Sequence, residues 1–233
     1  MVIQLFSLAL TGRADKALPH RMAAIQPTPL YLARHAETVF NHARRMQGNA
    51  AHTPLTRAGI LQAEAMGAAL ARHFAAGPVP RIWASPAGRA LQTASVIAEH
   101  LGVGFFAITA DARLREIEVG DWTGRDYAEI VAQEGEILDH AHRLFRMPIP
   151  GGEHYADIAT RLQSWLADAG DAPALVVSHG MTARVLRGLL VGGPVYEGVP
   201  IAADVPQGTV MRISGGSEEA VHPGDGSTGP RGA

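Results

Sequence analysis

Short apolar runs alternate with longer amphipathic segments through the central part of the chain. Each run is only four or five residues long, which predicts β-strands. These runs lie at residues 29–33, 81–84, 104–108, 174–177 and 209–213. Between them, apolar side chains recur at helical spacing. The helices predicted in this way span residues 56–74, 87–101, 154–169 and 180–190, with one or two more in 124–146. This alternation favours an α/β fold: a three-layer sandwich with a mostly parallel central sheet and helices on both faces.

The two ends of the chain lack this alternation. Residues 1–23 begin with an apolar segment that no basic residue precedes, which is the wrong charge order for a signal peptide. We therefore expect a poorly ordered N-terminal extension and a cytoplasmic protein. Residues 214–233 are rich in Gly, Ser, Pro and acidic side chains, a composition that predicts a disordered tail. The folded domain is predicted to span residues 24–213.

Composition and charge exclude several classes of protein. Hydrophobic residues make up 47% of the 233 residues, enough for a packed core. The net charge of -2 provides no bulk positive field, so we expect no nucleic-acid partner. Cysteine is absent from the sequence, which excludes thiolate metal sites and a cysteine nucleophile. No apolar run approaches the ~20 residues that span a bilayer, so we expect no membrane partner.

Reactive or anion-binding side chains follow four of the predicted strands. Arg34 and His35 follow the first strand, Arg89 the second, Glu116 the third and His179 the fourth. Ligands of open α/β sheets bind beyond the carboxyl ends of the strands, so these side chains should converge. Guanidiniums suit anionic oxygens, and imidazole is a nucleophile or donor near neutral pH. The set fits phosphoryl transfer through a covalent phosphohistidine.

Over about residues 29–213 the sequence resembles the histidine phosphatase superfamily, which has the phosphoglycerate-mutase-like fold. The motifs that carry the resemblance are YLARHAET (31–38), Asn41, Gln47-Gly48, TPLTRAG (53–59), Ser85-Pro86 with Arg89, LREIEVGDWTG (114–124), PGGE (150–153) and LVVSHG (175–180). Three residues depart from the family pattern. Ala36 stands where Gly is usual, Thr123 where Glu is frequent, and Gln207 where Asn is frequent.

The resemblance implies a role for each matching residue. His35 would be the nucleophile that is phosphorylated, and Glu116 would protonate the leaving oxygen and then activate water. Ligands of the phosphoryl oxygens would be Arg34, Arg89 and His179. The remaining positions of the implied phosphate pocket are Asn41, Gln47, Gly48 and Gly180. This scheme requires neither a metal nor a cofactor.

Three functions remain open from the sequence. We favour a hydrolase of a small phosphomonoester, because Pro150 comes only 34 positions after Glu116 and Lys16 is the sole lysine. Dedicated mutases of the family carry a long basic insertion after this glutamate. The alternatives are a phosphoglycerate mutase and a non-catalytic phosphate-binding module. The substrate stays open among ribazole phosphate, phosphorylated sugars, sugar acids and broad specificity, and so does the oligomeric state.

Residues 140–146 add a hypothesis about the pocket rim. Arg143 and Arg146, with His140 and His142, are candidates to recognise a second anionic group; the alternative is a basic, solvated helix end. A metal site that combines these two histidines with His154 is disfavoured, because side chains two residues apart on a helix point to different faces.

Overall fold

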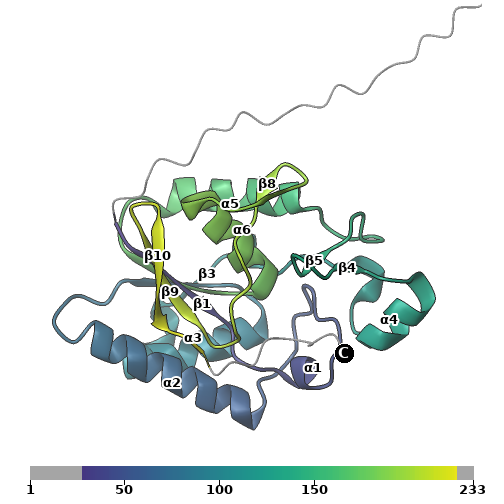
Figure 1. The fold of residues 1–233 in the computed structure, drawn as a ribbon. Coiled ribbons are helices and arrows are strands. Elements are labelled where there is room, and N and C mark those ends of the chain that lie inside the picture. The colour runs from purple at the N-terminus through teal and green to yellow at the C-terminus, as the bar shows by residue number, and fades with distance from the viewer. Residues whose placement is uncertain (1–27, 225–233) are drawn as a thin grey trace, which may run out of the picture.

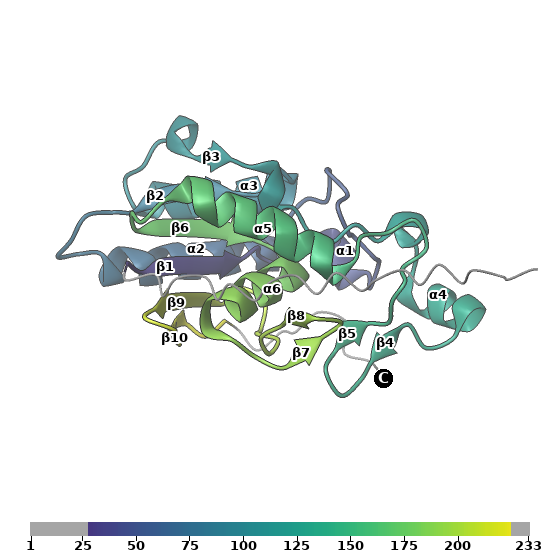
Figure 2. The ribbon, with the colours of Figure 1, turned by 90° about the horizontal axis from the view of Figure 1, so that it is seen from above.

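A six-stranded sheet forms the centre of the computed structural model, which describes residues 28–224 (Figure 1). Four strands are parallel: β1 (Leu30–Arg34), β6 (Ala174–Ser178), β2 (Arg81–Ala84) and β3 (Thr109–Ala110). The strand order is β10-β9-β1-β6-β2-β3, which can be followed across the sheet in Figure 2. The prediction of a mostly parallel central sheet is confirmed.

Helices cover both faces of this sheet. α2 (Arg57–His73) and α3 (Gly88–His100) lie below it in Figure 1, and α5 (Tyr155–Ala169) and α6 (Gly180–Val191) lie above it. Each face has its own hydrophobic core, because successive side chains of a strand point to opposite faces. The predicted three-layer α/β sandwich is confirmed.

Strand β1 shows how the sequence divides between the two cores. Tyr31 and Ala33 are buried in the core that includes side chains of α2 and α3. Leu30 and Leu32 are buried in the other core, with side chains of α5 and α6. A strand that is covered on both faces needs apolar side chains at every position, which is why it reads as a continuous apolar run.

An antiparallel hairpin completes one edge of the sheet. β9 (Val210–Ser214) pairs with β1, and β10 (Ser217–His222) pairs with β9. The prediction of a disordered tail from residue 214 onward is wrong for this strand. Its polar composition suits an edge strand, and the buried guanidinium of Arg187 donates to both carboxylate oxygens of Glu218 at 2.6 and 2.7 Å. The predicted N-terminal extension and residues 225–233 lie outside the described residues.

Two other predicted elements differ in the structure. The third predicted strand, 104–108, is wrong: the 3-10 turn η1 (Phe105–Ala107) occupies it, with Phe106 99% exposed, and the strand β3 begins only at Thr109. In residues 124–146, one helix, α4 (Tyr127–Glu134), ends at Gly135, whose φ of 82° suits glycine. A β-hairpin follows in place of a second helix.

The remaining short elements lie in the loops between these layers. They are α1 (Val39–His42), η2 (Ala112–Leu114), η3 (Gly120–Trp122), β4 (Leu138–Asp139), β5 (Leu144–Phe145), β7 (Val195–Tyr196) and β8 (Val199–Pro200). The strands β4 and β5 pair with each other in an antiparallel hairpin, called the rim hairpin below. Within residues 28–224, no helix combines the length and the apolar character needed to cross a membrane.

Candidate active site

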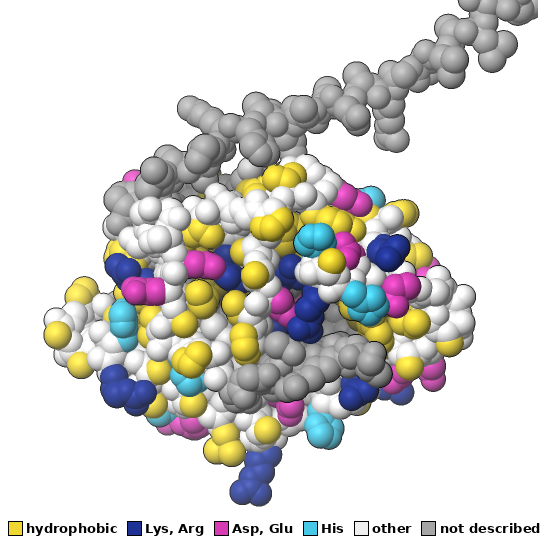
Figure 3. All heavy atoms as spheres, in the orientation of Figure 1, with side chains coloured by type: hydrophobic (Ala, Val, Ile, Leu, Met, Phe, Trp, Pro, Cys, Tyr) yellow, Lys and Arg dark blue, Asp and Glu magenta, His cyan; other side chains and the backbone are white. Residues whose placement is uncertain are grey.

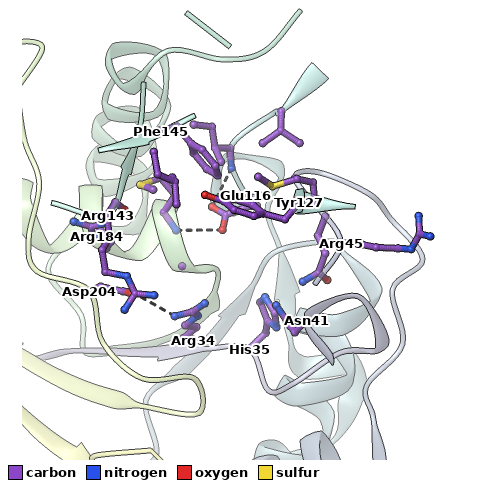
Figure 4. A pocket seen from close by; sticks show the side chains of 18 of the residues that line it. Arg34, His35, Asn41, Arg45, Glu116, Tyr127, Arg143, Phe145, Arg184 and Asp204 are labelled. Atoms are coloured by element: carbon purple, nitrogen blue, oxygen red, sulfur yellow. Dashed lines mark hydrogen bonds and ion pairs between the residues drawn. The ribbon is translucent and has the colours of Figure 1, made fainter. Parts of the chain in front are cut away.

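The predicted site residues converge on one pocket at the carboxyl ends of β1, β2 and β6 (Figure 4). Eight of the nine predicted residues line it: Arg34, His35, Asn41, Gln47, Gly48, Arg89, Glu116 and Gly180. The ninth, His179, is fully buried beside it, with its ring centroid 5.1 Å from that of His35. The convergence that the strand pattern predicted is present in the structure.

His35 has one committed ring nitrogen and one open nitrogen. Its Nδ1 lies 2.8 Å from the carbonyl oxygen of Ala36. A carbonyl oxygen only accepts, so Nδ1 carries the proton of the neutral ring and Nε2 keeps its lone pair. Burial lowers the pKa of His35 well below 6.5, and the nearby charge of Arg89 lowers it further. The ring is therefore neutral at pH 7.

Arg89 is a fully buried cation beneath the pocket. Its Nη2 donates to the carbonyl of Gly48 at 2.7 Å, and its Nη1 donates to the Ala50 carbonyl at 2.8 Å and to the Thr53 hydroxyl at 3.0 Å. Its Nε donates to Nδ1 of His179 at 3.2 Å. Burial lowers the pKa of Arg89 to about 10, so the guanidinium stays charged at pH 7.

The contacts of His179 define its tautomer. An arginine Nε only donates, so the contact with Arg89 makes Nδ1 of His179 the acceptor and leaves the proton on Nε2. Nε2 then donates to the Ser85 hydroxyl at 2.7 Å. Burial and then Arg89 lower the pKa of His179 well below 6.5, so this ring is also neutral. Ser85, known from the sequence only as part of a motif, orients the second histidine.

Arg34 offers an open donor beside His35. Its Nη1 donates to the Val205 carbonyl at 3.0 Å and lies 3.5 Å from Oδ1 of Asp204. Its Nε is buried and has no hydrogen-bond partner among the described residues. A Cβ at Gly180 would lie 3.2 Å from this guanidinium, so glycine leaves the guanidinium accessible. A buried donor without a partner costs free energy that an anionic ligand would recover.

Glu116 is held at the N-terminus of α6. Its Oε2 accepts from the N–H of Met181 at 3.1 Å, and its Oε1 accepts from those of Thr182 and Ile117, both at 3.0 Å. These amides would otherwise be unpaired, and the helix dipole favours a carboxylate there. Dashed lines at the Glu116 carboxylate in Figure 4 mark hydrogen bonds that it accepts. The contacts fix the orientation of Glu116 on the pocket wall.

Two amide side chains present their N–H groups to the pocket. Oδ1 of Asn41 accepts from the backbone of Thr38 at 3.1 Å and from Nε2 of Gln207 at 2.9 Å. Oε1 of Gln47 accepts from the Thr38 hydroxyl at 2.9 Å. With both oxygens occupied, the amide nitrogens remain as donors. Gln207 also donates to the carbonyl of His35 at 3.3 Å, a positioning role that the sequence marked only as a departure from the family pattern.

A second wall of the pocket was largely missed by sequence reasoning. Its polar members are Arg143, Arg184 and Asp204, and its aromatic and aliphatic members include Tyr127, Leu138 and Phe145. Only Arg143 was among the candidate rim residues. Arg146 does not line the pocket; its Nε donates to the carbonyl of Leu138 at 3.2 Å. No motif signals this wall, because its members come from α4, the rim hairpin, α6 and the loop at Asp204, which lie far apart in the sequence.

The histidines near the rim are engaged with carboxylates. His140 lies 2.9 Å from Glu136, and His142 lies 2.8 Å from Asp139; both histidines are exposed. They belong to the turn of the rim hairpin, so the expected basic helix end is wrong. Charged and histidine side chains gather on the surface around this hairpin (Figure 3). In the described part of the chain, no group of three or more acidic, histidine or cysteine side chains is arranged to hold a metal ion.

Comparison with known proteins identifies the family. A model of the histidine phosphatase superfamily (branch 1) matches residues 30–225, and the chain belongs to this superfamily. The probable phosphoglycerate mutase GpmB of Yersinia pestis is 33% identical over 172 residues, which cover 72% of this chain and 76% of GpmB. The resemblance predicted from the motifs is confirmed.

Solved structures with the same fold include two proteins of 27–28% identity. A mycobacterial glucosyl-3-phosphoglycerate phosphatase superposes with a TM-score of 0.66 and 27% identity, covering 80% of this chain and 90% of that chain. YhfR of Bacillus stearothermophilus superposes with a TM-score of 0.63 and 28% identity, covering 86% and 98%. The mycobacterial phosphatase has also been solved with inorganic phosphate.

Proposed function

We propose that the protein hydrolyses a small phosphomonoester through a phosphohistidine formed at His35. The observation that carries this proposal is the contact of His35 Nδ1 with the Ala36 carbonyl, which leaves Nε2 with its lone pair in a pocket shared with the guanidiniums of Arg34 and Arg89. A neutral imidazole has the lone pair that attacks phosphorus, whereas an imidazolium has none. The lowered pKa of His35 keeps the ring in the reactive form.

In the first step, Nε2 of His35 forms a bond to phosphorus while the bond between phosphorus and the leaving oxygen breaks. Arg34 and Arg89 stabilise the negative charge on the phosphoryl oxygens, aided by the amide donors of Asn41 and Gln47. The protonated carboxyl of Glu116 gives its proton to the leaving oxygen. The products are the free alcohol and phospho-His35.

In the second step, water attacks the phosphorus of phospho-His35. The carboxylate of Glu116 accepts a proton from this water while the bond between phosphorus and Nε2 breaks. Inorganic phosphate is released, and both His35 and Glu116 return to their starting states. His179 supports both steps by holding Arg89 through its Nδ1. No step requires a metal, and we propose that chelators leave the reaction unaffected.

A phosphoglycerate mutase is the second candidate function, favoured by the 33% identity to a probable phosphoglycerate mutase. In that reaction the phosphoryl group returns from His35 to a sugar acid in place of water. The phosphatase among the structural relatives favours hydrolysis. An assay of phosphate release and a coupled mutase assay, with and without bisphosphoglycerate, separate the two candidates.

A panel of phosphomonoesters assayed for phosphate release tests the proposed function. We expect release by the wild-type chain with and without EDTA, and a stoichiometric, base-stable phosphoenzyme when the reaction is quenched. His35→Ala should abolish both signals, whereas His73→Ala, on an exposed residue at the end of α2, should preserve them. Full activity of the His35→Ala protein would exclude the phosphohistidine.

A further inference from the structure

The end of the pocket at Arg34, His35 and Arg89 is called the phosphoryl end below. From it the pocket extends toward the second wall, whose members come from α4, the rim hairpin, α6 and Asp204. Figure 4 shows Arg143, Arg184 and Asp204 together on this side of the pocket, with Arg34 between them and His35. The leaving group of a phosphomonoester held at His35 has to lie along the remaining walls. The charges of the second wall therefore bear on which leaving groups fit.

Arg184 has a structural part in this wall. Its Nε donates to the Ala202 carbonyl at 2.9 Å, and its Nη1 and Nη2 donate to the carbonyls of Arg143 and His142 at 2.7 and 2.8 Å. One buried guanidinium thus ties the rim hairpin to α6 and to the segment that precedes Asp204. Every nitrogen of Arg184 is already engaged with the backbone.

Arg143 and Asp204 form a looser pair at the mouth of the pocket. Nη1 of Arg143 lies 3.6 Å from Oδ2 of Asp204, and the Arg143 side chain is 42% exposed. Oδ1 of Asp204 lies 3.5 Å from Nη1 of Arg34 and accepts from the N–H of Val205 at 3.0 Å. The carboxylate of Asp204 therefore sits between a guanidinium of the phosphoryl end and a guanidinium of the rim.

An anionic group of a substrate would be attracted to the same position between Arg34 and Arg143. A second anion next to the phosphoryl group has its most accessible cations in Arg34 and Arg143, because three of the five N–H donors of Arg184 are held by backbone carbonyls. Arg89 is held at the phosphoryl end by its own acceptors, and Arg45 donates to the Gly124 carbonyl at 2.7 Å and points away from His35 in Figure 4. Asp204 already occupies the space between the two available cations and repels a further anion.

We propose that Asp204 is a specificity-determining residue that selects against phosphomonoesters with a second anionic group next to the reacting phosphate. Its carboxylate accepts hydrogen bonds, so it favours an uncharged leaving group that carries hydroxyls, as in a sugar or polyol phosphate. The apolar surfaces of Tyr127, Leu138 and Phe145 provide contact area for the carbon skeleton of such a group. The inference rests on the proposed function, because it assumes that the phosphoryl group binds at His35.

Glycerol 3-phosphate and 3-phosphoglycerate test the proposal, because they differ only by a hydroxymethyl group against a carboxylate. We expect wild-type kcat/KM to favour glycerol 3-phosphate. Asp204→Asn removes the charge but keeps an oxygen that can accept from Val205. It should raise kcat/KM for 3-phosphoglycerate by roughly tenfold, a factor within reach of one close charge in a partly exposed site. The value for glycerol 3-phosphate should fall or stay the same.

Two further variants serve as comparisons: one should change kcat/KM for 3-phosphoglycerate in the opposite direction, and the other should not change the substrate preference. Arg143→Met leaves Asp204 without its rim partner and should lower kcat/KM for 3-phosphoglycerate below the wild-type value. Arg146→Met, in the same hairpin but outside the pocket lining, should leave the ratio between the two substrates unchanged. Thermal unfolding verifies that each variant is folded. A substrate ratio that Asp204→Asn leaves unchanged would overturn the proposal.

Measurements of binding without turnover test this inference independently of the proposed hydrolysis. Calorimetric Kd values for both compounds are measured on His35→Ala and on His35→Ala/Asp204→Asn, where no turnover is needed. If the wild-type chain releases phosphate from no compound, the proposed hydrolysis fails. The charge inference still stands if Asp204→Asn tightens binding of 3-phosphoglycerate alone, and it fails if both compounds respond equally.

Discussion

The phosphoryl end of the pocket and its second wall are built in different ways. At the phosphoryl end, the reactive groups follow the buried strands of the central sheet, and Arg89 and His179 have no exposed surface. The second wall comes mainly from the short rim hairpin and the loop at Asp204, with single side chains from α4 and α6, and its Arg143 is 42% exposed. If the proposed function holds, this contrast predicts that the sheet positions the reacting groups, whereas loops, which tolerate change more readily, set the selectivity.

The charged and titratable groups are more tightly held at the phosphoryl end than at the second wall. At the phosphoryl end, burial keeps His35 and His179 neutral and surrounds the cation Arg89 with fixed acceptors. At the second wall, Arg143 and Asp204 meet at 3.6 Å without a hydrogen bond. A substitution at the buried end therefore should affect catalysis and stability together, and a substitution at the wall should change substrate preference.

The largest expected effect that would test this division comes from Glu116→Gln. Glutamine cannot supply a proton, so kcat/KM for an alkyl phosphate should fall by about 10²–10⁴-fold. The kcat/KM for p-nitrophenyl phosphate, whose leaving group needs little protonation, should fall much less, because kcat/KM excludes the later attack of water on phospho-His35. Steady-state kinetics on both substrates measure the difference. Equal losses on the two would remove Glu116 from the role of general acid.

Arg89→Lys should have the next largest effect. A lysine cannot reproduce the forked donation to Gly48, Ala50 and His179, so phosphoryl oxygens lose a fixed cation and His179 loses its orientation. We expect kcat/KM to fall by on the order of 10²–10³-fold for every substrate alike. A loss of kcat/KM that depended on the leaving group would contradict the division between the phosphoryl end and the second wall. Arg212→Lys, at an exposed pair with Glu219, is the matched control.

The pH dependence of the free energy of unfolding tests whether His35 and His179 are buried in their neutral form. The folded-state pKa values of His35 and His179 lie below 6.5, so below pH 6.5 the unfolded chain binds protons that the folded chain does not. The free energy of unfolding should therefore fall as the pH decreases through 6.5, and these two groups should have no effect above it.

Urea unfolding at pH 7.5 and 5.5 measures how much His35 and His179 contribute to the pH dependence of the free energy of unfolding. For two neutral buried histidines, the wild type should lose about 2–3 kcal/mol more than His35→Gln/His179→Gln between these pH values. The double variant serves as the reference because all other titrating groups are shared. Identical losses in the two proteins would show that the rings are not held neutral.

The smallest expected effect concerns the second wall. Arg184→Met leaves the carbonyls of Ala202, His142 and Arg143 without their donor and should loosen the rim hairpin. We expect KM for alkyl phosphates to rise by roughly threefold to tenfold, with little change in kcat. Inhibition by inorganic phosphate, which needs only the phosphoryl end, should stay unchanged. A matching loss of phosphate affinity would show that the two regions are coupled.

The sequence predicted which side chains meet at the carboxyl ends of the strands, because these residues are tied to local patterns. Arg34-His35 and His179 directly follow apolar runs, and a strand of that kind positions the next residues at the sheet edge. The rim hairpin was predicted as helix, because apolar spacing in residues 124–146 did not reveal the break at Gly135. Strand β10 was predicted as tail, because an edge strand needs few apolar side chains.

By itself the sequence determined strands β1, β2, β6 and β9, helices α2, α3, α5 and α6, and which polar residues follow the strands, since hydrophobic periodicity is a local property of the chain. Only the tertiary structure decided the tautomer of His179, the cap that α6 provides for Glu116, and the placement of Asp204 between Arg34 and Arg143. These features are hydrogen bonds and ion pairs between segments 61 to 170 residues apart. Their distances of about 3 Å follow from how the layers pack, which no local pattern encodes.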